Sequence, residues 1–154
     1  MSEASIALVR SLWDRFERRD WTGARRLLAD DAIMTWICTA ERFRGGDAVI
    51  AVNAAYPEGW LIHVVECVAL TDGRILSLVR VEHPPQTFFA TSLFQVEYGL
   101  IAGIEEYWAT AEMPPRWRTD GQLPGYERLS QSSANSGSQS SGMPDSVSGG
   151  AVSR

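Results

Sequence analysis

Four consecutive segments with the pattern of long β-strands restrict the possible folds of this chain more than any other feature. They span residues 61–70, 74–83, 87–98 and 100–110. The Asp72-Gly73 pair in the first connection strongly favours a tight hairpin. The Pro84-Pro85 pair cannot lie inside a central strand, so it marks a loop, and a further turn is expected near Gly99. The pattern predicts four long antiparallel strands joined by hairpins.

Amphipathic helices are predicted ahead of these strands. From Ala4 to Arg19, apolar residues recur at steps of three and four, which is the period of one buried helix face. These apolar positions are Ile6, Val9, Leu12, Trp13 and Phe16. Thr22 is then expected to cap a second, short helix, which carries Leu27 and Leu28 and ends at a turn formed by Asp30 and Asp31.

A short strand or hairpin is predicted between the second and third helices. Residues 33–39 are rich in β-branched and aromatic side chains, and residues 41–44 continue towards two glycines. Asp47 is expected to cap a third helix, which ends where Pro57 pushes Tyr56 away from helical angles. Three helices followed by long antiparallel strands predict an α+β domain with its helices on one side of the sheet.

The composition indicates one folded domain followed by a tail. The chain has 154 residues, of which 45% are hydrophobic and 21% are charged, so a core can form without metals or disulfides. Residues 129–154 are mostly Ser, Gly, Gln and Asn, with too few large apolar side chains to offset the entropy of ordering them. We therefore expect a domain at residues 1–128 and a disordered tail at residues 129–154.

The charge pattern argues against several classes of partner. The net charge is -5, and the arginines of the first two helices alternate with acidic residues, so no basic face for nucleic acid is expected. No apolar run approaches the length of a membrane span, and residues 1–10 lack a secretion signal, which predicts a cytoplasmic protein with reduced Cys38 and Cys67. His63 and Cys67 would lie roughly 13 Å apart along a strand, too far to share a metal, and we expect neither a metal nor a cofactor.

The order of these segments resembles the nuclear-transport-factor-2-like (NTF2-like) superfamily, and most closely its polyketide-cyclase-like, or SnoaL-like, branch. The resemblance rests on the helix pair at residues 13–32, on Phe43-Arg44-Gly45, on residues 96–101 and on Glu105-Glu106-Tyr107-Trp108. It implies a cone in which three N-terminal helices pack on a strongly curved, mostly antiparallel sheet. It also implies a small-molecule pocket on the concave face and a homodimer through the convex face, for which we expect an apolar surface around Val96.

Two lines of reasoning place a proton-transfer group on the last strand, and they differ by one residue. Without a bulge, strand alternation puts one set of residues on a single face, namely Ile101, Gly103, Glu105 and Tyr107. An ungapped match to the His-Trp-Asp run of the polyketide cyclases instead places the acid at Glu106, with Glu105 where those cyclases have the histidine. A β-bulge would reconcile the two, so both carboxylates are candidates for the catalytic group.

Other side chains are candidates for the pocket. His63 alternates with Val65 and Cys67, so it is expected to face the cavity as a partner of the carboxylate. Several aromatic residues are expected to line a cavity for a small hydrophobic molecule. The predicted lining residues are Trp13, Trp36, Phe88 and Tyr107.

Two functions remain open at this point. One is a cofactor-free isomerase, cyclase, dehydratase or hydrolase that uses acid/base chemistry on a hydrophobic substrate. The other is a ligand-binding or protein-interaction module without turnover. Because the resemblance implies a fold shared by both classes, it cannot choose between them.

Overall fold

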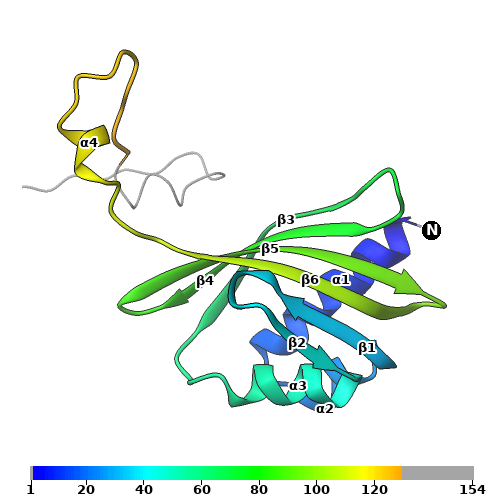
Figure 1. The fold of residues 1–154 in the computed structure, drawn as a ribbon. Coiled ribbons are helices and arrows are strands. Elements are labelled where there is room, and N and C mark those ends of the chain that lie inside the picture. The colour runs from blue at the N-terminus through cyan, green and yellow to red at the C-terminus, as the bar shows by residue number, and fades with distance from the viewer. Residues whose placement is uncertain (1, 130–154) are drawn as a thin grey trace, which may run out of the picture. The chain divides into compact units, whose positions relative to one another are not determined.

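The computed structural model describes residues 2–129, which form two separate units, one ending at Glu112 and one beginning at Met113. Figure 1 shows the elements in order. The helices of the first unit are α1 (Ser2–Glu17), α2 (Trp21–Arg25), the 3-10 turn η1 (Ile37–Thr39) and α3 (Gly46–Ala55). Its strands are β1 (Leu28–Trp36), β2 (Glu41–Arg44), β3 (Leu61–Ala69), β4 (Ile75–His83), β5 (Gln86–Glu97) and β6 (Leu100–Thr110).

The six strands form one mixed sheet in the order β2-β1-β6-β5-β4-β3. Strands β3 to β6 are the antiparallel series that the sequence predicts, and each pairs with the next. Strand β1 joins this series through a parallel pairing with β6, while its other edge pairs antiparallel with β2. The first unit is therefore an α+β domain with its N-terminal helices on a six-stranded mixed sheet.

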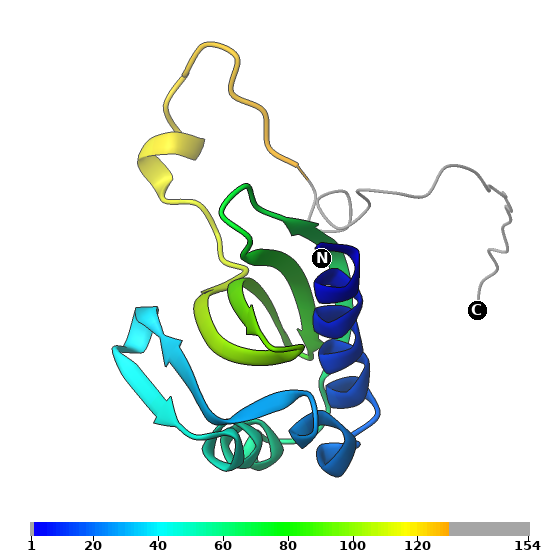
Figure 2. The ribbon, with the colours of Figure 1, turned by 90° about the vertical axis from the view of Figure 1, so that its right-hand side faces the viewer.

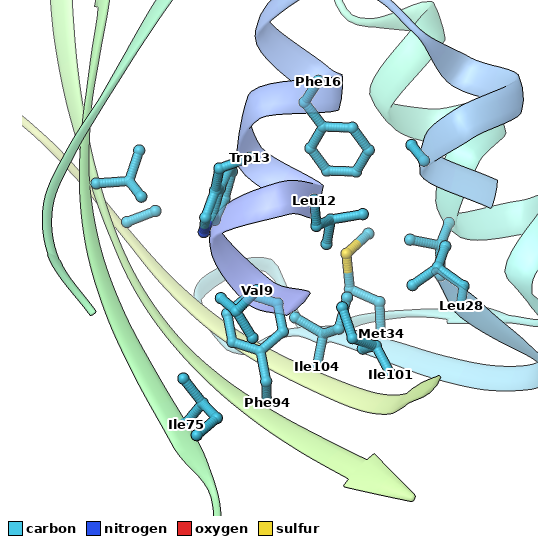
Figure 3. Packing of buried hydrophobic residues seen from close by; sticks show 14 of the residues in the cluster. Val9, Leu12, Trp13, Phe16, Leu28, Met34, Ile75, Phe94, Ile101 and Ile104 are labelled. Atoms are coloured by element: carbon cyan, nitrogen blue, oxygen red, sulfur yellow. The ribbon is translucent and has the colours of Figure 1, made fainter. Parts of the chain in front are cut away.

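The predicted first helix is confirmed, and its apolar stripe forms the centre of the core. Val9, Leu12, Trp13 and Phe16 are buried, and each such side chain contributes about 1.5–3 kcal/mol relative to exposure. Figure 2 shows α1 running along the sheet, and Figure 3 shows its side chains facing those of the strands. The rings of Trp13 and Phe94 meet edge to face with centroids 6.3 Å apart.

The second helix differs from the prediction at both ends. Its N-cap is Asp20, not Thr22, because the Asp20 carboxylate accepts a hydrogen bond from the backbone N–H of Gly23 at 2.9 Å. The helix stops at Arg25, and Leu28 is already the first residue of β1. The predicted turn at Asp30 and Asp31 therefore lies inside a strand, where both side chains are exposed.

The third helix forms where predicted, but Asp47 does not cap it. The N-cap is Gly45, whose φ of 99° lies in a region that side chains disfavour, and it provides no side-chain hydrogen bond. Asp47 instead accepts a hydrogen bond of 2.7 Å from Nε of Arg25. This ion pair connects α3 to α2.

Two β-bulges change which side chains face the helices. In β6, Gln95 opposes Gly103 while Val96 opposes Ile101, so Ala102 is an extra residue. In β3, Val64 opposes Val79 while Glu66 opposes Leu78, so Val65 is an extra residue. Each bulge reverses the inward and outward alternation beyond it.

The second unit contains the short helix α4 (Arg116–Thr119), in which Arg116 pairs with Asp120 at 2.9 Å. Leu129, its last described residue, is exposed. The rest of the predicted disordered tail lies outside the described residues. None of the helices within residues 2–129 combines the length and the hydrophobicity needed to cross a membrane.

Candidate functional site

A cavity of about 250 Å³ lies in the first unit, and half of its lining residues are aromatic. The lining residues come from α1, η1, α3, all six strands and the segment between α3 and β3. They are Trp13, Phe16, Trp36, Cys38, Thr39, Glu41, Asn53, Tyr56, Trp60, Ile62, Val81, Phe88, Trp108 and Thr110. Trp13, Trp36 and Phe88 thus lie in the wall, as the sequence predicts.

Two of the lining tryptophans are fixed by buried acceptors. Trp13 donates from Nε1 to Oγ of the fully buried Ser77 at 3.0 Å. Trp36 donates from Nε1 to Oε1 of Glu106, also at 3.0 Å. Because each acceptor is buried, these bonds hold the two rings in one orientation against the cavity.

Glu106 is the one buried carboxylate in the part of the chain that the structure describes, and its side chain is 4% exposed. Oγ of Ser92 donates a hydrogen bond of 2.6 Å to its Oε2. Burial raises the pKa of Glu106 above its ordinary value, and the hydrogen bonds from Ser92 and Trp36 oppose that rise only in part. Glu106 does not itself line the cavity but lies hydrogen-bonded to Trp36, which does.

Glu105 and Tyr107 lie outside the cavity lining, contrary to the alternation argument. Oη of Tyr107 donates a hydrogen bond of 2.5 Å to Oε1 of Glu105, and Tyr107 is 41% exposed. This bond and the nearby negative charge raise the pKa of Tyr107. Glu105 and Tyr107 lie outside the lining because of the bulge at Ala102. This bulge puts Glu106, and not Glu105, on the same side of the sheet as the buried Ile101 and Ile104.

His63 is also absent from the cavity lining. Its Nε2 lies 3.5 Å from Oε2 of Glu82, and both side chains are partly exposed. The alternation argument put His63 on the same face as Cys67, but the bulge at Val65 separates them, so that Cys67 is buried and His63 is not. The structure therefore brings no histidine to Glu106.

Sequence reasoning missed several lining residues, of which Trp60 and Trp108 carry the clearest chemical feature. Their Nε1 atoms are buried and have no hydrogen-bond acceptor within residues 2–129. Both are aromatic, but nothing in the sequence distinguishes them from aromatic residues of the core. Nothing in the sequence identifies Glu41, Asn53 or Tyr56 as lining residues, because only the tertiary fold brings them to the cavity.

The described part of the chain holds no group of three or more His, Cys, Asp or Glu side chains placed to bind a metal ion. The polar groups of the cavity wall are few, and the carboxylate among them belongs to Glu41. Chemically, the site can enclose an apolar molecule and offer it a small number of hydrogen-bonding groups.

Solved structures with the same fold are numerous. A candidate ketosteroid isomerase from Kribbella flavida DSM 17836 is 26% identical, with a TM-score of 0.74 over 84% of this chain and 92% of that one. An NTF2-like protein of unknown function from Burkholderia xenovorans LB400 is 16% identical, with a TM-score of 0.68 over 84% and 99% of the two chains. An LEH-like epoxide hydrolase from M. tuberculosis is 18% identical, with a TM-score of 0.60 over 70% and 84%.

No family model and no curated protein matches the sequence. The assignment therefore comes from the fold, which matches these solved structures over most of their length although each shares at most 26% of its sequence with this chain. With helices on a six-stranded mixed sheet over nearly the whole length of these relatives, the chain belongs to the nuclear-transport-factor-2-like superfamily.

Proposed function

We propose that this protein binds a small, largely apolar molecule in the aromatic cavity of its NTF2-like domain. The observation that carries the proposal is the cavity of about 250 Å³, whose wall includes Trp13, Trp36, Trp60 and Trp108. Small-molecule sites in proteins are typically concave and apolar, with a few placed polar groups. Aromatic rings also offer large contact areas to a flat ligand.

The wall is already ordered before a ligand arrives. Trp13 and Trp36 hold buried hydrogen bonds to Ser77 and Glu106, so their rings need not be immobilised on binding. Preorganisation of this kind favours affinity because less side-chain entropy is lost. The cavity, at about 250 Å³, is slightly smaller than the range of about 300–1,000 Å³ for drug-sized ligands, which favours a compact ligand.

Binding can be tested with N-phenyl-1-naphthylamine, an uncharged two-ring probe whose fluorescence rises in apolar surroundings. We expect saturable binding to the full chain. Val81→Phe should reduce the affinity because Val81 is buried in the wall, and Thr110→Phe at the rim should do so with less risk to folding. Leu78→Phe is the matched control, since Leu78 is 37% exposed and lies outside the lining. Absence of saturable binding, or equal loss in the control, would refute the proposal.

A second candidate is an acid/base enzyme, as the names of the ketosteroid isomerase and epoxide hydrolase relatives suggest. It is favoured by Glu106, because a buried carboxyl with a raised pKa keeps its proton to higher pH and suits proton donation in an apolar site. In this case Trp36 would have to move for Glu106 to reach a substrate, since the ring carries the contact with the cavity.

Turnover can be tested with 5-androstene-3,17-dione, by following the absorbance of the conjugated ketone product. If Glu106 transfers the proton, Glu106→Gln should abolish the reaction while Glu105→Gln should leave it unchanged. Equal rates in both variants would assign any proton transfer to a different group. Binding of the steroid without turnover would favour the binding module.

We further propose that two copies associate through the sheet face opposite the helices. The residue expected there from the sequence, Val96, instead packs against the core. The exposed apolar side chains are Val65, Leu78 and Phe89, from three neighbouring strands. Sedimentation at micromolar concentration should show a dimer, and Phe89→Glu should convert it to a monomer.

A further inference from the structure

The cavity wall has a buried floor and an exposed rim, and the two differ in chemistry. The floor is apolar, and its buried lining residues are Trp13, Phe16, Trp60 and Val81. The exposed lining residues each carry a hydroxyl, thiol or carboxyl group, and they are Cys38, Thr39, Glu41, Tyr56 and Thr110. A ligand with an apolar body and one polar end would match both parts of the wall.

Glu41 supplies the one charged side chain among the described lining residues. Every ion pair found within residues 2–129 uses a different carboxylate. Arg42 and Arg44 follow Glu41 in β2, but neither lines the cavity, and they alternate with it along the strand, so they project to the other face. The carboxylate therefore lies at the rim without a cation of the described chain to neutralise it.

Glu41 lies beside Trp36, because the two are direct register partners in the antiparallel pair of β1 and β2. Side chains opposite each other in such a pair have Cβ atoms about 4.5–5.5 Å apart. The Trp36 ring is held by its 3.0 Å hydrogen bond to Glu106 and by edge contact with Phe43, with ring centroids 4.8 Å apart. A carboxylate beside a fixed indole offers an ammonium group both an opposite charge and a π face.

The opposite side of the cavity is unsuited to a cation. Trp60 immediately precedes β3, and β3 and β2 are the two edge strands of the sheet. The guanidinium carbon of Arg19 already lies 3.3 Å from the centroid of the Trp60 ring. A second cation at Trp60 would be repelled by this like charge. The wall therefore favours one orientation of a cationic ligand, with its charged end towards Glu41 and its apolar end towards Trp60.

We propose that the ligand of this cavity is an organic ammonium ion, protonated or quaternary, whose nitrogen lies beside Glu41 and Trp36 and whose apolar part covers the buried floor. The inference rests on the proposed binding function and adds the chemical class of the ligand and its orientation. It assigns Glu41 as the residue that distinguishes a cation from a neutral molecule. An anion is disfavoured, because no arginine or histidine is among the described lining residues.

The test uses two probes of matched shape, trimethyl(2-naphthylmethyl)ammonium and 2-neopentylnaphthalene, the second of which has a quaternary carbon in place of the charged nitrogen. Each probe displaces N-phenyl-1-naphthylamine from the full chain, and the ratio of the two affinities is measured. Glu41→Gln should lower the relative affinity for the ammonium by about two- to fivefold, as expected for the loss of one exposed ion pair. Differences in hydrophobicity cancel because the same two probes are compared in each protein.

Glu97→Gln is the matched control, since it removes the same charge from an exposed residue outside the lining. It should leave the affinity ratio unchanged, which separates a local effect of Glu41 from an effect of net charge. No displacement by the ammonium, an unchanged ratio in Glu41→Gln, or an equal change in both variants would overturn the inference while leaving binding itself intact. Failure of N-phenyl-1-naphthylamine to bind would instead refute the proposed function.

The orientation is tested on the unmodified protein, which avoids any folding defect of a variant. The nine N-methyl protons of the ammonium probe are equivalent, and their NOEs in the complex identify the neighbouring aromatic rings. We expect NOEs to the ring protons of Trp36 and none to those of Trp60. N-methyl NOEs to Trp60, or the absence of any to Trp36, would contradict the proposed position of the charged nitrogen.

Discussion

Trp36 and Glu106 are register partners in the parallel pair of β1 and β6, and Nε1 of Trp36 donates a 3.0 Å hydrogen bond to the carboxylate of Glu106. This pair connects the wall of the cavity to the most deeply buried acidic group of the described chain. It depends on the parallel pairing, which places Trp36, the last residue of β1, beside Glu106 in β6.

The first prediction concerns the pH dependence of stability. Because burial raises the pKa of Glu106, the folded protein holds this proton at a pH where the unfolded chain, with a value near 4.5, has lost it. Its contribution to stability is therefore complete below about pH 4.5 and is lost as the pH rises through the folded pKa. Glu106→Gln should remove this loss, so the variant should gain stability relative to the parent as the pH is raised.

The measurement is the free energy of unfolding by urea from pH 4 to pH 8. The glutamine can keep both contacts, with its carbonyl accepting from Trp36 and its amide donating to Ser92. Glu105→Gln is the control, and its difference from the parent should not change in this way because Glu105 is not buried. A difference for Glu106→Gln that stays constant over the whole range would show that the Glu106 pKa is not raised.

The second prediction concerns the acceptor of Trp13. Ser77→Ala should destabilise the protein by about 1–3 kcal/mol, since it leaves a buried indole N–H without a partner. Thr71→Ala, at an exposed turn, should change stability by less than about 0.5 kcal/mol. Urea unfolding measures both. A loss for Ser77→Ala no larger than for Thr71→Ala would mean that the hydrogen bond does not stabilise the wall.

The third prediction concerns Arg19, which stacks on Trp60 and donates to the Trp60 carbonyl at 2.8 Å. Arg19→Ala should cost about 1–2 kcal/mol, from the lost stacking and hydrogen bonding. Arg19→Lys should not restore it fully, because an ammonium lacks the planar fork of donors. The neighbouring Arg18→Ala is the control, with an expected change below about 0.5 kcal/mol, since its exposed pair with Asp14 is weak.

The fourth prediction uses the two thiols. Cys38 is exposed and lines the cavity, whereas Cys67 is buried, and burial raises the Cys67 pKa. At pH 8, 5,5′-dithiobis(2-nitrobenzoate) should modify Cys38 at least tenfold faster than Cys67, because only the thiolate reacts. N-phenyl-1-naphthylamine should slow the reaction of Cys38. Cys38→Ser should abolish the fast phase, and a fast phase that survives in this variant would contradict the assignment.

Several elements of the fold could be predicted because their signals are local. The three- and four-residue spacing of Val9, Leu12, Trp13 and Phe16 predicts α1, and the Asp72-Gly73 turn predicts the β3–β4 hairpin. The second helix was less predictable. Thr22 and Asp20 are both suitable caps, and the choice between them depends on which side chain reaches the N–H of Gly23.

The candidate site was predicted only in part, and β-bulges account for the errors. Strict alternation pairs Glu105 with Ile101 and His63 with Cys67, but Ala102 and Val65 are extra residues that reverse the facing of each strand. A bulge is a mismatch between two paired strands. It therefore cannot be located from the residues of one strand.

By itself, the sequence determined the order of helices and strands, the buried face of α1 and the aromatic character of the cavity, because each depends on neighbouring residues and their periodicity. Only the tertiary structure decided the parallel pairing of β1 with β6, the burial of Glu106 and the unsatisfied donors of Trp60 and Trp108. These features depend on contacts between residues far apart in the chain. Tertiary packing alone determines whether such a polar group meets water, a partner or a cavity.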